Sequence, residues 1–349
     1  MKRNPSILAA AALAAAGIAS PSIAEINAIA GNLRLAREFT GTPTPGEIYE
    51  INASLTVESN FSEPLTTYAT GFRDAADLEN ENRFFGPPVQ VTERFEYAQH
   101  DNADAFRSDA NEDLRPRGAD FPRVEMKSEK VQAKTENRGL MTVLELKDYN
   151  TPGKTEAAVR SLLMRLQRNK LRRKLALLSA AAVNTAKTWN TDAGKDPDQD
   201  VMAELITAAG LSGITPNRVG YGATAWSKRG LSHRAQNSAG GFASASLTPE
   251  SLAGLLGVEE ALVSNARYTS GASRAEALGN LVLAFNADDF ASEEDASNIK
   301  DFWSPCDLSG ERFAVYEFPI GAKLIGIAVE HNEKIAITST LGIRKLTIS

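Results

Sequence analysis

The stretch that decides the fold runs from Asn150 to Trp189 and reads NTPGKTEAAVRSLLMRLQRNKLRRKLALLSAAAVNTAKTW. It opens with a helix start signal, because Asn150 and Thr151 precede Pro152. Apolar residues then recur at helical spacing: Val159, Leu162, Leu163, Leu166, Leu171, Leu175, Leu178, Ala182, Val183 and Ala186. At 1.5 Å per residue, roughly 35 residues predict a helix about 50 Å long. Because the mean helix has about 11 residues, we expect this one to act as a girder.

The same stretch is strongly basic and has no acidic residue between positions 160 and 174. Its candidate contact residues are Arg160, Arg165, Arg168, Lys170, Arg172, Arg173 and Lys174. Three interpretations stay open at this point. The residues form a solvated helix face, they pair with an acidic neighbouring subunit, or they meet a phosphate backbone.

Composition bounds the class of protein. The chain has 349 residues, with 42% hydrophobic and 23% charged, which is typical of a soluble globular protein of about two domains. The net charge of -6 argues against a dominant basic surface for nucleic acid, so any DNA contact must be local. A single cysteine, Cys306, excludes an internal disulfide and a multi-cysteine zinc site.

The N-terminus supports two interpretations. Lys2 and Arg3, an apolar stretch from Ile7 to Ile18 and small residues up to Ala24 are typical of a secretory signal. Alternatively, Ser22 and Glu25 form a capping box at the start of a helix, and residues 1–38 are an alanine-rich arm that docks on a partner. The apolar stretch is too short for a good transmembrane span.

Extended segments lie between the N-terminal region and the long helix. After a linker at residues 40–45, alternating apolar and polar residues predict a strand at 88–98. About twenty polar residues follow, and then two more extended sets, with Val124, Met126 and Val131 in the first and Leu140 to Leu146 in the second. Long strands with polar residues on both faces are marginal alone, so we expect them to lie on a neighbouring chain.

The C-terminal half alternates helices and strands and then ends in strands. Predicted helices are 201–211, 223–236 and 248–257; predicted strands are 217–221, 261–268, 281–285, 313–318, 324–329, 335–338 and 343–348. Residues 238–246 are predicted as a loop and 288–295 as an acidic loop. The long helix and the β tail flank the α/β insert. The fold class is therefore predicted to be α+β, with one domain interrupted by another.

Motifs for chemistry are weak. The sequence from Gly220 to Ala225 fits G-x-G-x-x-A between a strand and a helix, but it lacks the acidic residue about 20 positions later that a dinucleotide site needs. We interpret it as a tight strand-to-helix turn. No hydrolase or phosphate-loop motif occurs, the acidic loop lacks calcium-site spacing, and Cys306, His233 and His331 are interpreted as structural. We predict no catalytic, cofactor or metal residue, and hence no enzyme.

Longer matches in the same order give a resemblance over residues 88–349. They are Leu175 to Leu178, Asn184 to Trp189, Gly194 to Asp198, Pro216 to Val219, Arg234 to Ala245, Leu252 to Val258, Ser297 to Lys300 and Thr338 to Leu346. In these segments the chain resembles the major capsid proteins of tailed bacteriophages and prophages, the family with the HK97-type fold.

The resemblance implies a division of the chain. Residues 1–87 would be the N-terminal arm and linker, and 88–148 the extended β-hairpin called the E-loop with its lead-in strands. Residues 149–194 and 309–349 would form the peripheral domain, with the long helix as its spine. Residues 195–308 would form the α/β axial domain.

The resemblance also implies a function and partners. The chain would self-assemble through pentamers and hexamers into the icosahedral virion shell in the host cytoplasm, with a portal, a scaffold or a protease as further partners. It would enclose double-stranded DNA through weak, non-specific contacts and involve no membrane. We expect the basic residues of the spine to be largely paired across subunits, because a strongly basic interior would impede packaging. Two alternatives remain: an encapsulin-like nanocompartment shell, and an exported binding protein with a cleaved signal peptide.

Overall fold

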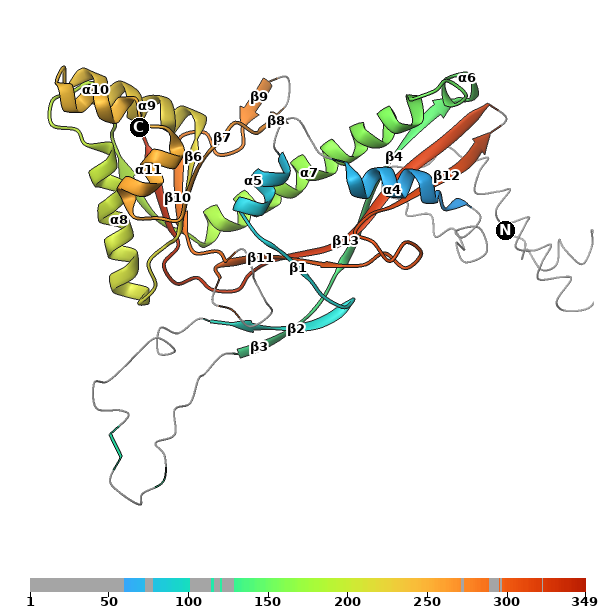
Figure 1. Ribbon diagram of the computed structural model, residues 1–349, viewed down its shortest axis with the longest axis horizontal. Coiled ribbons are helices and arrows are strands. Elements are labelled where there is room, and N and C mark those ends of the chain that lie inside the picture. The colour runs from blue at the N-terminus through green and yellow to red at the C-terminus, as the bar shows by residue number, and fades with distance from the viewer. Residues whose placement is uncertain are drawn as a thin grey trace, which may run out of the picture. The chain divides into compact units, whose positions relative to one another are not determined.

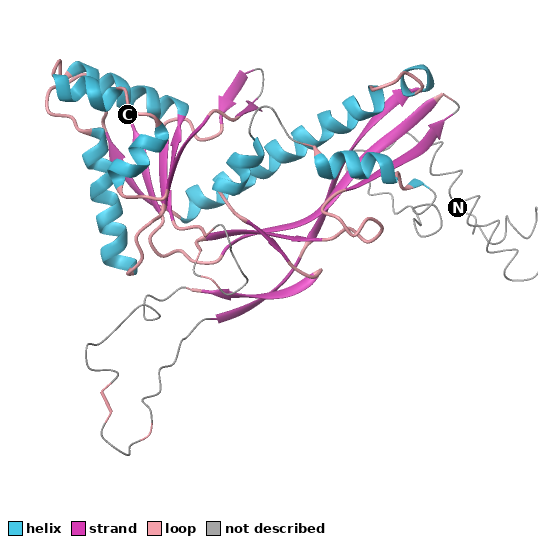
Figure 2. Cartoon of the chain, in the orientation of Figure 1, coloured by secondary structure: helices cyan, strands magenta, loops and turns pink. Residues whose placement is uncertain are grey.

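The computed structural model describes residues 60–72, 78–100, 114–115, 120, 129–270, 273–288, 295, 297–321 and 323–349. The predictions for the signal or arm at residues 1–38, for the tip of the E-loop, for the strand around Val124 and for most of the acidic loop lie outside these residues. Two five-stranded sheets, a set of helices and two short hairpins make up the described part (Figures 1 and 2). The predicted α+β class is confirmed.

The long helix, α7, is Lys154–Ala181 and joins two hydrophobic cores. Its 28 residues span about 42 Å at 1.5 Å per residue. Near its start, Val159 and Leu163 pack with α4 (Glu63–Gly71) and with two strands of the first sheet. Near its end, Leu171 and Leu178 pack with α5 (Leu78–Phe84) and with strands of the second sheet (Figure 1).

The predicted end of this helix at Trp189 is wrong. Val183–Lys187 forms strand β5, which pairs in parallel with β14 (Arg344–Ile348). Val183 and Ala186 continued the apolar spacing of the helix, but the backbone of this segment bonds to β14 instead. A long-range strand partner is invisible to a local helical pattern.

The first sheet has the order β1-β11-β13-β12, with β4 on the other side of β13. Its members are β1 (Pro88–Gln90), β11 (Ile299–Ser304), β12 (Ala314–Gly321), β13 (Leu324–Ile337) and β4 (Glu136–Glu145). Strand β13 pairs along its length with β4, from Leu324 opposite Glu145 to Glu333 opposite Glu136. The helix α7 packs on this sheet and buries Val315, Ile327 and Val329.

The second sheet has the order β5-β14-β10-β6-β7. Its further members are β6 (Arg218–Gly222), β7 (Glu260–Ser264) and β10 (Leu281–Phe285). A core that includes Val219, Tyr221, Val282 and Leu346 lies between this sheet and its helices. These helices are α8 (Pro197–Ser212), α9 (Ala223–Ala235), α10 (Ala239–Ala245) and α11 (Pro249–Leu256).

Two antiparallel hairpins and one short helix complete the described part. Strand β2 (Arg94–Gln99) pairs with β3 (Glu129–Lys134), and β8 (Arg267–Ser270) pairs with β9 (Ser273–Glu276). The short helix α6 (Leu146–Tyr149) follows β4. The strands predicted at 88–98 and 140–146 therefore correspond to β1 with β2 and to β4.

Several predicted elements differ from the structure. The predicted loop at 238–246 contains α10, whose start is capped by Ser238 because its Oγ accepts from the amide of Gly241 at 3.0 Å. The predicted strand 261–268 is split between β7 and β8, and the two predicted strands at 324–329 and 335–338 are one strand, β13. Strands β9 and β11 were not predicted.

The strands of each sheet come from more than one predicted domain. Strands β5 and β14 lie in one sheet with β6, β7 and β10, although residues 149–194 and 309–349 were predicted to form the peripheral domain and 195–308 the axial domain. Strand β11 lies in the first sheet, although it falls within the predicted axial range 195–308. The predicted domain boundaries stay a prediction. The chain crosses between the two sheets more often than one inserted domain would require.

Candidate functional site: a buried ion cluster and an outer arginine row

The structure divides the basic residues of α7 into two groups. Lys170 and Lys174 are 5% and 1% exposed, whereas Arg160, Arg165, Arg168 and Arg172 are exposed. The two lysines follow Leu163 and Leu166 on the buried stripe of the helix at spacings of three and four residues. Arg173 lies beside them and is half-buried.

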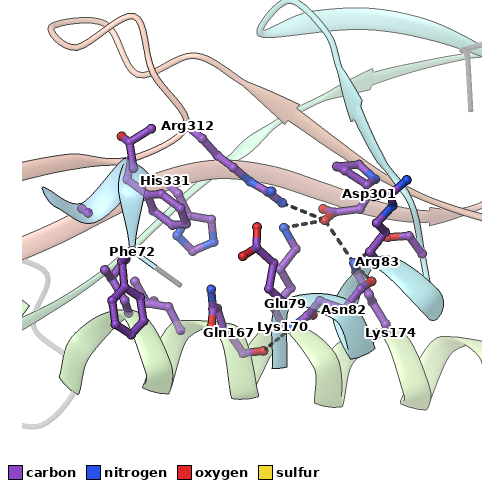
Figure 3. A pocket seen from close by; sticks show the side chains of 17 residues that line it. Phe72, Glu79, Asn82, Arg83, Gln167, Lys170, Lys174, Asp301, Arg312 and His331 are labelled. Carbon is purple, nitrogen blue, oxygen red and sulfur yellow. Dashed lines mark hydrogen bonds and ion pairs between the residues drawn. The ribbon is translucent and has the colours of Figure 1, made fainter. Parts of the chain in front are cut away.

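One carboxylate oxygen holds three of the cations at this interface. Asp301 Oδ2, on β11, lies 2.5 Å from Lys170 Nζ, 3.1 Å from Lys174 Nζ and 3.1 Å from Arg312 Nη2. Figure 3 shows the three side chains converging on Asp301. The aspartate is 1% exposed, so the contact between α7 and β11 is made in the interior.

A second carboxylate extends the cluster along β13. Glu333 lies 3.2 Å from Lys170 Nζ and 3.1 Å from His331 Nε2, and it also accepts from Arg173. Arg138 on β4 approaches it at 3.6 Å. We call Asp301, Glu333, Lys170, Lys174, Arg173, Arg312 and His331 the buried ion cluster. It links α7 to β11 and β13, and Arg138 on β4 approaches its edge.

Lys174 also ties α7 to α5. Its Nζ donates to the carbonyl of Asn82 at 2.7 Å and to that of Gly86 at 2.8 Å. A Cβ on Gly86 would meet the Lys174 side chain at 3.3 Å, so glycine lets the chain approach the ammonium closely. The lysine thus satisfies carbonyls at the end of α5 that the helix itself leaves without a partner.

Burial and charge pull the pKa values of the cluster in opposite directions. Burial lowers the pKa of Lys174 to about 7, against the attraction of Asp301. For Asp301, burial favours the neutral acid, but Lys170, Lys174 and Arg312 outweigh it and hold the pKa below its usual value. Glu333 behaves in the same way, with its pKa lowered by His331 and Lys170 against burial. Burial lowers the pKa of His331 despite its contact with Glu333.

A cavity of about 400 Å³ adjoins the cluster. Figure 3 shows its polar lining, with Gln167 and Lys170 from α7, Glu79 from α5, and His331 and Arg312 opposite them. The lining holds no serine or cysteine nucleophile beside a base. Among the described residues, no group of three or more His, Cys, Asp or Glu side chains could hold a metal ion.

A separate ion cluster fixes α8 on α9. Arg229 donates to Asp198 from Nε at 2.6 Å and from Nη2 at 2.8 Å, and His233 Nε2 lies 3.1 Å from the same carboxylate. All three are buried. The interpretation of His233 and His331 as structural residues fits these contacts, since each histidine contacts a buried carboxylate and packs in the interior.

The glycine motif at 220–225 is a tight turn between β6 and α9. A Cβ on Gly222 would lie 2.0 Å from the carbonyl oxygen of Gly279, and one on Gly220 would lie 2.6 Å from the Phe85 ring. At the start of α9, Glu276 accepts from the amide of Thr224 at 3.2 Å and from its Oγ1 at 2.9 Å. A carboxylate therefore lies where a dinucleotide would place its phosphate.

Cys306 is 1% exposed and forms no disulfide. Burial, followed by the charge of Glu330, raises the pKa of its thiol to about 12. A thiol of this kind is unreactive, which agrees with its interpretation as a structural residue.

The exposed arginines of α7 form a row on the opposite side from the cluster. Arg165, Arg168 and Arg172 follow each other at spacings of three and four residues, and we call them the outer arginine row. Within the described residues, no carboxylate lies at ion-pair distance from any of them, nor from Arg160. Arg172 stacks over the Tyr268 ring at 4.0 Å from its centroid.

The sequence predicted the basic residues of α7 but not the acidic half of the cluster. Asp301 and Glu333 lie more than a hundred residues away on strands, and only the fold brings them to the helix. One signal for Lys170 and Lys174 was present, because both continue the spacing of the apolar stripe. None of the helices in the described ranges has the length and apolar character needed to cross a bilayer.

Comparison with known proteins addresses the fold. The sequence matches no family model, and it matches no curated protein. Among solved structures, it is similar to a phage-related protein from Bordetella bronchiseptica RB50, with a TM-score of 0.62 and 19% identity, over 82% of this chain and 96% of that one.

Two capsid structures are also similar, at lower scores. The capsid of cyanophage P-SCSP1u has a TM-score of 0.48 and 10% identity, over 90% of this chain and 94% of that one. The mature capsid of bacteriophage PhiM1 has a TM-score of 0.45 and 12% identity, over 87% and 91%. Both scores are below 0.5, so the conclusion rests on the first likeness: this chain has the fold of the Bordetella phage-related protein.

Proposed function

We propose that this chain is the major capsid protein of a tailed phage or prophage, a subunit that self-assembles into the icosahedral shell around double-stranded DNA. The observation that carries the proposal is the shared fold with a phage-related protein over 96% of that protein's length. Short segments between residue 88 and the C-terminus resemble those of tailed-phage capsid proteins and occur in the same order. This resemblance supports the proposal independently of the fold.

The surface of the helical part supports assembly. Ile206 and Leu211 on α8 are each 68% exposed, and Leu231 on α9 and Phe242 on α10 are more than half exposed. Large apolar side chains at this exposure are better suited to a subunit contact than to water. A shell repeats such contacts around each subunit, so no single contact needs to be strong.

The edge of the first sheet supports assembly as well. Strand β4 pairs only with β13 among the described strands, so its other edge is open over 10 residues. Met141 and Val143 on this strand are exposed. A long open edge with apolar side chains invites another chain unless it is covered, and a neighbouring subunit would cover it.

The proposal extends to the finer assignments of the sequence. In it, α7 is the spine helix, the first sheet belongs to the peripheral domain and the second sheet to the axial domain. The hairpin of β2 and β3 is the base of the E-loop. The subunit is structural and not catalytic, has a portal and a scaffold or protease as partners, and assembles in the host cytoplasm.

Electron microscopy of the purified recombinant chain tests the proposal. We expect closed icosahedral shells, and packaged DNA or an accompanying portal in particles from phage-producing cells. Shells that hold a cargo enzyme instead would select the encapsulin-like alternative. A monomer whose mature N-terminus is Glu25 would contradict the capsid proposal and support an exported protein.

A further inference from the structure

The outer arginine row is an uncompensated line of positive charge. Arg165, Arg168 and Arg172 are exposed, and the residues one turn before and after them on α7 include no acid. Like charges at these spacings destabilise a helix. In a chain with net charge -6, a local excess of this kind is not a consequence of composition.

The chemistry of the row differs from that of the buried side of the same helix. The three cations of the row are all arginines, whereas the two buried cations of α7, Lys170 and Lys174, are lysines. Arginine presents a planar fork of donors that matches phosphate oxygens bidentately, and it is the preferred residue for phosphate recognition. Lys170 and Lys174 are buried and paired with Asp301, so between positions 165 and 174 the exposed arginines are the cations that a ligand can reach.

The spacing of the row also fits a polyanion. Seven residues of helix separate Arg165 from Arg172, which is about 10 Å along the axis. In one strand of duplex DNA a phosphate recurs about every 3.4 Å along the axis, so about three phosphates face this length. Because α7 is a straight element fixed at both ends by hydrophobic cores, it presents the row in a defined line.

We propose that the outer arginine row of α7 binds the phosphate backbone of nucleic acid, without reading the bases. The proposal deepens the proposed function and rests on it for the identity of the ligand, the enclosed genome. For these three arginines it replaces the expectation that the basic residues of the spine pair across subunits. The contact is confined to three side chains per subunit. It therefore agrees with a net negative protein that must release its contents, since affinity and its salt dependence grow with the number of phosphates neutralised.

Fluorescence anisotropy of a labelled 24-bp duplex of mixed sequence, titrated with dissociated subunits of the full-length protein between 50 and 200 mM NaCl, tests the proposal. Three contacts predict a slope of log K against log salt of about -2.7, or about a 40-fold loss of affinity over this range. The R165Q/R168Q/R172Q variant should lose this slope. The R165K/R168K/R172K variant should keep most of it, because charge rather than shape dominates counterion release.

A matched control removes the same charge elsewhere. Arg94, Arg234 and Arg274 are exposed and lie outside α7, so the R94Q/R234Q/R274Q variant should keep the wild-type slope. Equal slopes for the wild type and the outer-row variant would overturn the proposal. Row-dependent binding of poly-L-glutamate without binding of the duplex would also overturn it, in favour of an acidic protein surface.

Electron microscopy of the same protein preparations before dissociation separates this proposal from the proposed function. Shells without row-dependent DNA binding would leave the capsid proposal intact and reject the role of the row. DNA binding that depends on the row, without shells, would support the role of the row and contradict the capsid proposal.

Discussion

Asp301 concentrates the contact between the long helix and the first sheet on one carboxylate oxygen. Lys170, Lys174 and Arg312 all approach that oxygen, and none of the three has another carboxylate as close. Buried charges of this kind contribute little net stability as a set, because desolvation offsets their attraction. Removal of one partner is different, since it leaves the others buried and uncompensated.

The Asp301→Asn variant tests this asymmetry. We expect a loss of about 3–5 kcal/mol in the free energy of unfolding, because three cations lose their shared anion in the interior. Denaturant unfolding followed by circular dichroism measures it. Glu93→Gln removes an exposed partner of Lys134 and is the control, expected to change stability little. Equal small effects for both variants would show that the cluster is open to water.

The lowered pKa of Lys174 predicts how the stability of the folded chain depends on pH. Its pKa of about 7 in the folded chain is below the ordinary value of 10.5, so between these pH values the unfolded chain binds more protons. Folding stability therefore rises with pH in this window, by up to about 1.4 kcal/mol per pH unit, and the burial penalty is largest below pH 7.

The Lys174→Met variant isolates this effect from the other titrating groups. The free energy of unfolding of the wild type minus that of the variant should increase from pH 7 to pH 9, because methionine has no proton to release. Urea unfolding at pH 7, 8 and 9 measures the difference. A difference that is independent of pH would mean that Lys174 stays protonated throughout.

At the scale of elements, the sequence best predicted those helices and strands whose ends are set by nearby residues. The helices α9 and α11 were predicted near their observed bounds, and Thr248, for example, caps the start of α11. The start of α8 was placed four residues too late, at 201, although Asp196 caps the helix just before Pro197. The end of α7 was missed because β14 pairs with β5 from more than 150 residues away. Strand β11 was missed because its burial on both faces removes the alternation that marks a strand.

The difference between local signals and long-range contacts also explains how much of the candidate site could be predicted. Charge counting found the seven basic residues of α7 between positions 160 and 174 but could not separate the inward lysines from the outward arginines. Helical spacing would have separated them, since Lys170 and Lys174 occupy positions of the apolar stripe. Asp301, Glu333 and Arg312 come from β11, β13 and the segment before β12, and no local signal connects them to the helix.

The turn between β6 and α9 gives a matched pair of glycine substitutions. Gly222→Ala places a Cβ 2.0 Å from the Gly279 carbonyl oxygen, so we expect a loss of about 1–3 kcal/mol or failure to fold. Gly230→Ala, inside α9 with nothing within 4 Å of its Cβ, should stabilise the helix by about 0.5–1 kcal/mol. Thermal unfolding compares the two. Similar shifts for both would contradict close packing at the turn.

At the scale of the whole molecule, α7 connects two cores, one built on the first sheet and one that contains residues of both sheets. Its first half belongs to the core with Val315 and Ile327, and its second half to the core with Leu283 and Phe285. Exposed apolar residues outside these cores occur on the helices of the second sheet, such as Ile206 and Leu211, and on β4, such as Met141 and Val143. Folding and assembly therefore depend on different residues, and substitutions can separate them.

The Ile206→Glu/Leu211→Glu variant tests this separation. Both side chains are 68% exposed in the single chain, so the variant should fold normally while charge at a subunit contact blocks shell formation. Circular dichroism with thermal unfolding checks the fold, and negative-stain microscopy counts the shells. Gln199→Glu, an exposed change on the same helix, is the control. Normal shells from the double variant would exclude this face of α8 from the assembly.

The single cysteine has a practical consequence for such experiments. Cys306 is enclosed by the strands of the first sheet, and its thiol resists ionisation up to high pH, so maleimide reagents at neutral pH should leave the native chain unmodified. A cysteine introduced at an exposed position would then carry the only reporter dye in each subunit. The natural sequence is thus already a background for single-site labelling, and distances between subunits can be followed by energy transfer while the particles form.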